Sequence, residues 1–216
     1  MKSVIQEGIA EHTMKKSRFI GYACHIQKEE DALAYIEKIK KLHPQARHHV
    51  SAYRISSQIL ERYDDDNEPK STAGLPILDS LQRAEIDCVC VVVVRYFGGI
   101  LLGKGGLVKA YTLASQLALD AGEVANWSRV EEVEIQVDYA QQGQIDFQLQ
   151  EENYQIEDKD YSEMVRYKMV IERTRMDAFQ NLINNLTRGQ AGIQVLGENR
   201  APVKAGKILT DKMEEV

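Results

Sequence analysis

Cysteine and proline are scarce in this sequence of 216 residues, and low-complexity tracts are absent. The chain has three cysteines and four prolines. An odd, small number of cysteines excludes a complete disulfide framework and predicts reduced thiols in a cytoplasmic protein. With 44% apolar and 28% charged residues, the composition is that of a globular protein and excludes a disordered or fibrous chain.

A long apolar run is also missing. The longest, residues 88–94, has about the length of a strand, whereas a membrane-spanning helix needs roughly 18 apolar residues or more. Glu7 and Glu11 interrupt the N-terminal stretch in which a secretory signal would be apolar. We therefore expect no membrane partner and no signal peptide.

An excess of positive charge is lacking as well. The net charge is −6, and residues 1–123 contain 16 basic and 16 acidic residues, so residues 124–216 carry all of the net negative charge. This charge balance gives no support for a general nucleic-acid-binding surface, and it is compatible with a local basic patch. The acidic C-terminal part is a candidate docking surface for a protein partner.

Hydrophobic periodicity predicts an α+β protein of two domains, residues 1–125 and 130–203, joined by a polar linker at 121–129. In the first domain, the run CVCVVVVRY at 88–96 is typical of a strand buried on both faces, and hence central in its sheet. The segment ERYDDDNEP at 61–69 has the composition of a loop. Further strands are predicted at 18–26 and 48–55, and helices at 29–42, 77–84 and 107–118.

Beyond residue 130 the predicted order is βαββαβ, the succession of a ferredoxin-like domain. Alternating apolar residues predict strands at 133–137 and 165–171, with shorter strands at 154–156 and 193–196. Helical spacing predicts helices at 140–152 and 176–186. The polar tail from Pro202 onward is expected to be loosely held.

A glycine-rich loop between a strand and a helix is the strongest candidate site. Backbone amides at a helix N-terminus attract anions, and glycines let a phosphate approach them closely. Lys104, Lys109 and Arg95 add positive charge, and Tyr96 could stack on a base. The alternative interpretation is purely structural, with glycines that permit tight turns. The glycines are Gly98, Gly99, Gly103, Gly105 and Gly106.

The glycine spacing matches neither a P-loop nor a dinucleotide fingerprint. No nucleophile elbow or Ser-His-Asp order can be identified either. The sequence thus identifies no catalytic residue and no cofactor, and leaves enzyme activity uncertain.

Carboxylates and hydroxyls form a second candidate site just before the helix at 77–84. Asp65, Asp66 and Glu68 could hold Mg²⁺ through oxygen ligands, although a run of aspartates is more often a solvated loop. Ser71 and Thr72 are N-cap residue types, and with Gly74 they could form another anion cradle.

The first domain contains the candidate histidines His25, His43, His48 and His49. Adjacent His48 and His49 would face opposite sides of a strand, and none has a cysteine or carboxylate at a recognisable ligand spacing. One of them could serve as a general base. Cys88 and Cys90 would share one face of their strand as core residues.

Four segments resemble the IMPACT family, whose bacterial members are called YigZ-like. They are RFIGYA (18–23), ARHHVSAYRI (46–55), DDDNEPKSTAGLPIL (64–78) and VVVVRYFGGILLGKGGLVKAY (91–111). The resemblance implies an N-terminal domain with a fold like domain 2 of ribosomal protein S-five. It also implies a C-terminal domain like the ferredoxin-like last domain of elongation factor G.

Both likenesses point towards RNA, the ribosome or a translation factor. The eukaryotic relatives oppose activation of a stress kinase, but this chain lacks their additional kinase-competing domain, so that role is not transferred. Two positions depart from the family pattern: Asn67 stands where glycine is usual, and Leu75 where arginine is common. Asn tolerates left-handed backbone, whereas loss of the arginine removes one phosphate contact.

Three functions follow as hypotheses. The first is a non-catalytic protein that binds RNA, the ribosome or a translation factor and regulates translation. The second is an enzyme or sensor that binds a small phosphorylated or nucleotide-like ligand at the glycine-rich loop. In the third, both domains are protein-interaction surfaces without a nucleic-acid contact.

Overall fold

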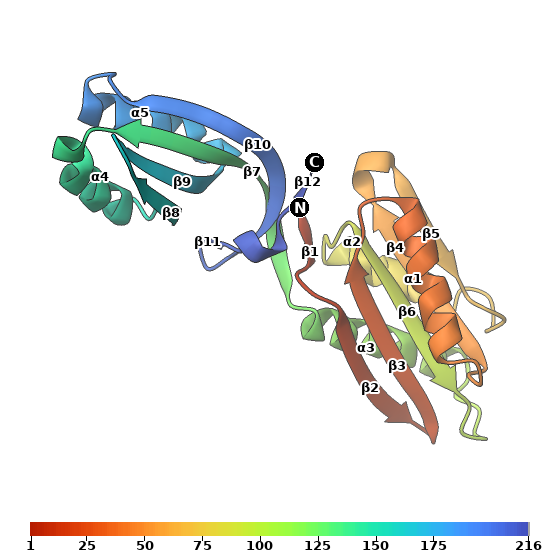
Figure 1. Cartoon of the computed structure of the whole chain (residues 1–216). Coiled ribbons are helices and arrows are strands. Elements are labelled where there is room, and N and C mark those ends of the chain that lie inside the picture. Colours follow the sequence, from red (N-terminus) through yellow and green to blue (C-terminus); the bar gives the residue numbers. More distant parts are fainter. Residues whose placement is uncertain (216) are drawn as a thin grey trace. The chain divides into compact units, whose positions relative to one another are not determined.

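The computed structural model describes residues 1–215 and divides the chain into two compact units, Met1–Ala125 and Asn126–Val216. Each unit is built around its own sheet (Figure 1). Between residues 1 and 215, no helix is long and apolar enough to cross a membrane.

The first unit contains a five-stranded antiparallel sheet in the order β2-β3-β6-β4-β5. β6 lies in the centre, and its residues from Val89 to Arg95 are all buried. This confirms the central strand that the β-branched run predicts. The strands of this sheet are β2 (Gly8–Met14), β3 (Ser17–His25), β4 (His48–Ile55), β5 (Leu60–Asp64) and β6 (Val89–Tyr96), whereas the short strand β1 (Lys2–Val4) lies outside it.

Helices cover both faces of this sheet. The helix α1 (Glu29–Leu42) packs on one face through Ala32, Ile36 and Ile39, in a core cluster with Val92 of β6. The helices α2 (Gly74–Arg83) and α3 (Lys104–Ala121) pack on the other face, in a second cluster. A short 3-10 helix, η1 (Ser56–Gln58), joins β4 to β5.

α3 lies directly on β2 and β3 because glycines remove the side chains between them. A Cβ atom on Gly21 would be 2.3 Å from the carbonyl oxygen of Ala114, and one on Gly8 would be 2.0 Å from that of Ala118. Contact between helix and strand backbones therefore sets the position of α3.

One prediction for the first unit is wrong, and one hairpin was not predicted. The segment 61–64 is part of β5 rather than a loop, because pairing with β4 supplies the hydrogen bonds that its polar composition does not predict. The unpredicted hairpin is formed by β2 and β3. Its turn is formed by Lys15 and Lys16 at φ 45° and 65°, residue types that do not indicate a tight turn.

The second unit has the βαββαβ succession with strand order β10-β7-β9-β8, which confirms the predicted α+β, ferredoxin-like fold. α4 and α5 lie against the sheet (Figure 1). Their packing residues are Ile145, Leu149, Phe179 and Ile183. The elements are β7 (Val124–Val137), α4 (Tyr139–Glu151), β8 (Ile156–Tyr161), β9 (Val165–Glu172), the 3-10 helix η2 (Arg173–Arg175), α5 (Met176–Thr187) and β10 (Gly192–Lys204).

The linker and the tail differ from expectation. The predicted linker at 121–129 is largely strand, because β7 begins at Val124. The tail beyond Pro202 is held by pairing with β10, in the registers Val203 with Ile208 and Asn199 with Glu215. Its elements are β11 (Lys207–Ile208), the 3-10 helix η3 (Thr210–Lys212) and β12 (Glu214–Glu215).

Candidate functional site

A pocket of about 340 Å³ opens in the first unit, at the edge where β6 ends and β4 begins. The loops that precede α2 and α3 complete its wall. Both of the long motifs from the sequence therefore contribute to one cavity. The lining residues are Arg47, His48, Asn67, Glu68, Pro69, Arg95, Phe97, Leu101, Leu102, Gly103, Lys104 and Leu107.

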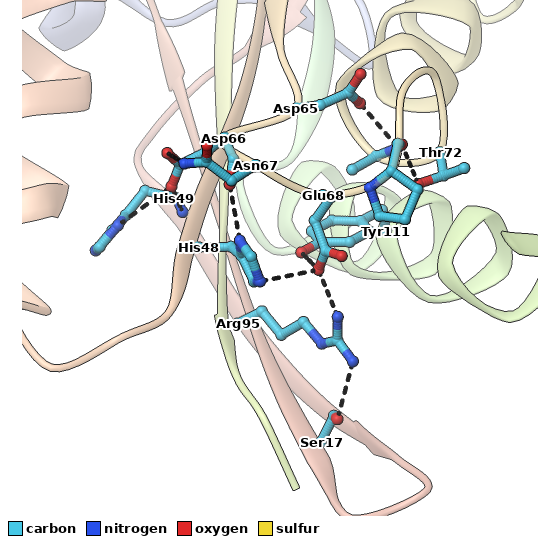
Figure 2. A network of polar contacts seen from close by, with 12 residues as sticks. Ser17, His48, His49, Asp65, Asp66, Asn67, Glu68, Thr72, Arg95 and Tyr111 are labelled. Atoms are coloured by element: carbon cyan, nitrogen blue, oxygen red, sulfur yellow. Dashed lines mark hydrogen bonds and ion pairs between the residues drawn. The ribbon is translucent and has the colours of Figure 1, made fainter. Parts of the chain in front are cut away.

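A buried polar network surrounds Glu68 (Figure 2). Its Oε1 atom accepts hydrogen bonds from Arg95 Nη1 at 2.5 Å and from Tyr111 Oη at 2.7 Å. Arg95 Nη2 also donates to Ser17 Oγ at 3.3 Å. Burial is the main cause that raises the pKa of Tyr111 above its ordinary value, so this phenol remains a neutral donor at physiological pH.

His48 lies beside this network, and its hydrogen bond to the backbone determines which ring nitrogen carries the proton. Its Nδ1 lies 2.7 Å from the carbonyl oxygen of Asp66, which can only accept, so Nδ1 carries a proton. In the neutral ring Nε2 is then an acceptor. It lies 3.7 Å from Glu68 Oε1 (Figure 2), beyond hydrogen-bond distance.

Arginines and an aromatic ring form another part of the wall. The guanidinium carbons of Arg47 and Arg95 each lie 5.4 Å from the ring centre of Phe97, within the range of a cation–π contact. Arg95 is only 4% exposed. Its enclosed Nε has no hydrogen-bond partner among the described residues.

The N-terminus of α3 meets the same pocket through Gly103, Lys104 and Leu107. Gly103 is the N-cap residue at φ 74°, and within residues 1–215 no side chain caps this helix end. Its first turn contains no acidic residue. The first-turn amides and the positive end of the helix dipole are therefore available to an anion.

The five loop glycines have different roles. Gly99 and Gly103 adopt positive φ, and a Cβ on Gly98 would be 2.0 Å from the backbone of Lys16. Those three positions thus require glycine for structural reasons. A Cβ on Gly106 would be 3.0 Å from Leu102 Cβ, whereas one on Gly105 would meet no described atom within 4 Å.

Two predicted contact residues lie elsewhere. Tyr96 belongs to the core cluster on the α1 face, because neighbouring strand residues point to opposite faces and Arg95 occupies the pocket face. Lys109 is exposed on α3 and is not among the pocket-lining residues.

The second anion cradle, predicted at Ser71, Thr72 and Gly74, is already filled by a carboxylate of the chain. Asp65 accepts backbone N–H bonds from Ser71 at 2.7 Å and from Gly74 at 2.8 Å, and also one from Ala73. Thr72 Oγ1 donates to the carbonyl of Pro69 instead of capping α2. The prediction that Ser71 or Thr72 caps α2 is wrong, since Asp65 takes that role from six or more positions away.

The predicted metal ligands have separate partners. Asp65 binds amides before α2, Asp66 Oδ2 accepts the backbone N–H of His49 at 2.6 Å, and Glu68 pairs with Arg95. Among the described residues, no group of three or more metal-ligating side chains could hold a metal ion. The geometry therefore gives the Mg²⁺ hypothesis no support.

The histidines are divided between the two faces of the sheet. His48 faces the pocket, whereas His49 Nε2 donates to the carbonyl of His43 at 3.0 Å on the α1 side. His43 contacts Tyr22 Oη through Nε2 at 2.5 Å and Tyr96 Oη through Nδ1 at 2.9 Å. The predicted opposition of His48 and His49 is thus confirmed.

The cysteines are core residues, as predicted for Cys88 and Cys90, which lie in the α1-side cluster. Burial raises the pKa of the Cys24 thiol to about 12 and that of Cys90 well above its ordinary value. Neither thiol is therefore activated as a nucleophile.

Several pocket residues were not identified from the sequence. Arg47, Phe97 and Leu101 lie inside or beside the quoted motifs, so their neighbourhood was recognisable although their roles were not. Ser17 and Tyr111 join the network from distant parts of the chain. No local signal connects either of them to Glu68.

Comparison with known families assigns both units. Residues 15–119 match the Impact N-terminal domain, and residues 135–190 match a domain of unknown function (DUF1949). A crystal structure described as that of a hypothetical protein is 31% identical, covers 90% of this chain and 96% of its own, and superimposes with a TM-score of 0.57.

Two bacterial relatives match nearly the whole chain. The IMPACT family member YvyE of Bacillus subtilis (strain 168) is 35% identical over 193 residues, which cover 89% of both chains. The IMPACT family member YigZ of Escherichia coli (strain K12) is 34% identical over 189 residues, which cover 86% of this chain and 92% of the relative. This chain belongs to the IMPACT family.

Proposed function

We propose that the first unit binds RNA through phosphate groups at the N-terminus of α3, as a non-catalytic protein that acts on the ribosome or with a translation factor. The translation setting is what the family resemblance implies. The RNA contact is argued from the pocket itself.

A single observation carries the proposal: the uncapped N-terminus of α3 opens on the pocket that Arg47, Arg95 and Lys104 also line. Helix N-termini favour anions through unsatisfied amides and through the helix dipole. The cations add charge-assisted hydrogen bonds to phosphate oxygens.

The charge available to a ligand is smaller than the number of cations suggests. Glu68 is paired with Arg95 in the pocket floor, so these two charges cancel. Within residues 1–215, Arg47 and Lys104 form no ion pair with a carboxylate. The pocket therefore offers about two free positive charges together with the helix dipole.

This count sets the expected salt dependence. Two phosphate contacts on single-stranded RNA give a logarithmic slope of about −1.4, or a loss of roughly sevenfold in affinity between 50 and 200 mM salt. A general basic coat would lose affinity much more steeply. The proposal thus predicts a shallow but measurable salt effect.

The test is a binding titration of fluorescent single-stranded RNA and of purified ribosomes across this salt range, with wild-type protein and charge-reversal variants. Lys104→Glu should abolish the salt-dependent affinity. Lys41→Glu is the matched control, because Lys41 lies exposed on α1, which covers the opposite face of the sheet. Unchanged RNA affinity in Lys104→Glu would refute the proposal.

Lys109→Glu separates the pocket from a broader surface of α3. The pocket predicts that Lys109→Glu, on the same helix but outside the pocket lining, retains most of the affinity. An effect as large as that of Lys104→Glu would move the binding site from the pocket to the exposed face of α3.

A further inference from the structure

The positive groups of this pocket lie at different depths, unlike those of an open groove that follows a nucleic-acid backbone. Its deepest cationic group, Arg95, is nearly fully buried, and His48 is also buried. Lys104 is exposed at the N-terminus of α3. A ligand must therefore insert a group into the pocket to reach the floor, and a strand lying across the surface does not reach it.

The donors at this floor suit an anion with several free oxygens. Arg95 Nε is enclosed and lacks a partner among residues 1–215, although the other guanidinium nitrogens bind Glu68 and Ser17. The amides of the first turn of α3 add further donors. A terminal phosphate offers three free oxygens and about −1.5 to −2 charge, which matches Arg47 and Lys104 better than an internal phosphodiester with a single charge.

His48 adds a feature that distinguishes the two kinds of phosphate. Because Nδ1 donates to the Asp66 carbonyl, the neutral ring presents Nε2 as an acceptor in the pocket wall. The singly protonated form of a terminal phosphate has a hydroxyl group that can donate a hydrogen bond to this nitrogen. An internal phosphodiester has no hydroxyl on phosphorus.

The remaining wall is apolar and aromatic. Phe97 is 38% exposed beside the Arg47 guanidinium, and Leu101 is 81% exposed although it is a large aliphatic residue. Leu102 and Leu107 continue this lining. Such a surface favours a flat aromatic body attached to the phosphate, stacked on Phe97 or Arg47. A volume of about 340 Å³ lies at the small end of the range for ligand pockets.

We propose that this pocket binds a terminal phosphate monoester carried by an aromatic body, which is the chemistry of a nucleoside 5′-monophosphate. The ligand is either a free nucleotide or the 5′-phosphorylated end of an RNA strand. The inference rests on the proposed function and narrows it from any phosphate of RNA to a terminal one.

The experiment compares two RNA oligonucleotides of identical sequence, one with a 5′-phosphate and one with a 5′-hydroxyl, by fluorescence anisotropy with a 3′ label. The 5′-phosphorylated strand should bind at least about tenfold more tightly. Arg47→Ala and Lys104→Ala should each remove most of this difference, and both positions lie outside the buried network. Lys41→Ala is the matched control and should retain it.

Competition identifies the source of the ligand. Displacement of the labelled strand by adenosine or guanosine 5′-monophosphate, but not by the nucleosides, assigns the pocket to free nucleotides as well. Displacement only by unlabelled 5′-phosphorylated RNA assigns it to RNA ends. Either result supports a terminal phosphate site.

Equal affinity for the two strands overturns the inference. If that shared affinity still depends on Lys104, the pocket binds internal phosphates and the proposed function stands. If neither strand binds in a Lys104-dependent way, the proposed function fails together with the inference.

Discussion

Arg95 donates a hydrogen bond of 2.5 Å to Glu68, although the two residues lie 27 positions apart in the sequence. The side chains are 5% and 4% exposed, so this is an ion pair within the interior of the first unit. The pair forms part of the pocket floor. Because its two charges cancel, the attraction of the pocket for anions comes from Arg47, Lys104 and the N-terminus of α3.

Removal of one partner should be much more harmful than removal of both. Arg95→Met leaves the buried Glu68 carboxylate without its cation and should lower the free energy of unfolding by about 3–5 kcal/mol. The double variant Arg95→Met/Glu68→Gln should recover part of this loss. Urea denaturation of the wild type and of both variants measures the free energy of unfolding. A loss below about 1 kcal/mol in the single variant would contradict a buried ion pair.

Asp65 should contribute to stability as the cap of α2. Asp65→Ala leaves the amides of Ser71, Ala73 and Gly74 without their acceptor, and we expect a loss of about 2 kcal/mol, the upper end for a capping residue. Asp79→Ala is the control, since its ion pair with Arg83 is exposed and 3.9 Å long. That variant should change stability by less than about 0.5 kcal/mol. Equal effects would argue against the cap.

Gly105 should show a conflict between stability and binding. Gly105→Ala places a methyl group in open space within the first turn of α3, and should raise the unfolding free energy by up to about 1 kcal/mol. The same methyl group should weaken phosphate binding by obstructing the approach to the helix amides. Gly143→Ala in α4, also with open space around its Cβ, should stabilise without a change in binding. Full RNA affinity in Gly105→Ala would exclude close contact with these amides.

His43 should make stability fall in mild acid. Burial, reinforced by His49 and Arg18, lowers the pKa of His43 below its ordinary value of 6.5. The unfolded chain therefore takes up this proton at a higher pH than the folded protein. The contribution of neutral His43 is fully present above pH 6.5 and decreases as the pH falls from there towards the folded-state pKa. The test is thermal unfolding of the wild type and of His43→Gln between pH 8 and 5. The Tm of the variant should decrease less than that of the wild type over this range. An equal decrease of Tm in the two proteins would contradict the prediction.

Local patterns were sufficient for much of this protein. The β-branched run of β6 predicts a buried central strand because such residues fit a sheet covered on both faces, and α1 and α2 cover those faces. The glycine-rich loop predicts an accessible helix N-terminus because glycines let an anion approach the backbone amides closely. The α+β class and the βαββαβ order follow from periodicity, which depends only on neighbours along the chain.

The position of Tyr96 outside the pocket could have been predicted from the sequence. Adjacent strand residues point to opposite faces, so Arg95 and Tyr96 could not both enter one pocket. The strand β5, by contrast, could not be predicted from its own residues, because these polar residues form a strand only through pairing with β4. Edge strands have few apolar contacts of their own, and composition indicates them poorly.

From the sequence, short-range backbone preferences and burial predict the central strand β6, the helices, the βαββαβ order of the second unit and the glycine-rich loop, but not β2, β5 or the paired tail. Only the folded structure shows that Glu68 pairs with Arg95 and that Asp65 fills the N-terminus of α2. Each of these outcomes joins groups that are distant along the chain. Hydrogen bonds and ion pairs act over a few ångströms in space, so only the folded arrangement selects their partners.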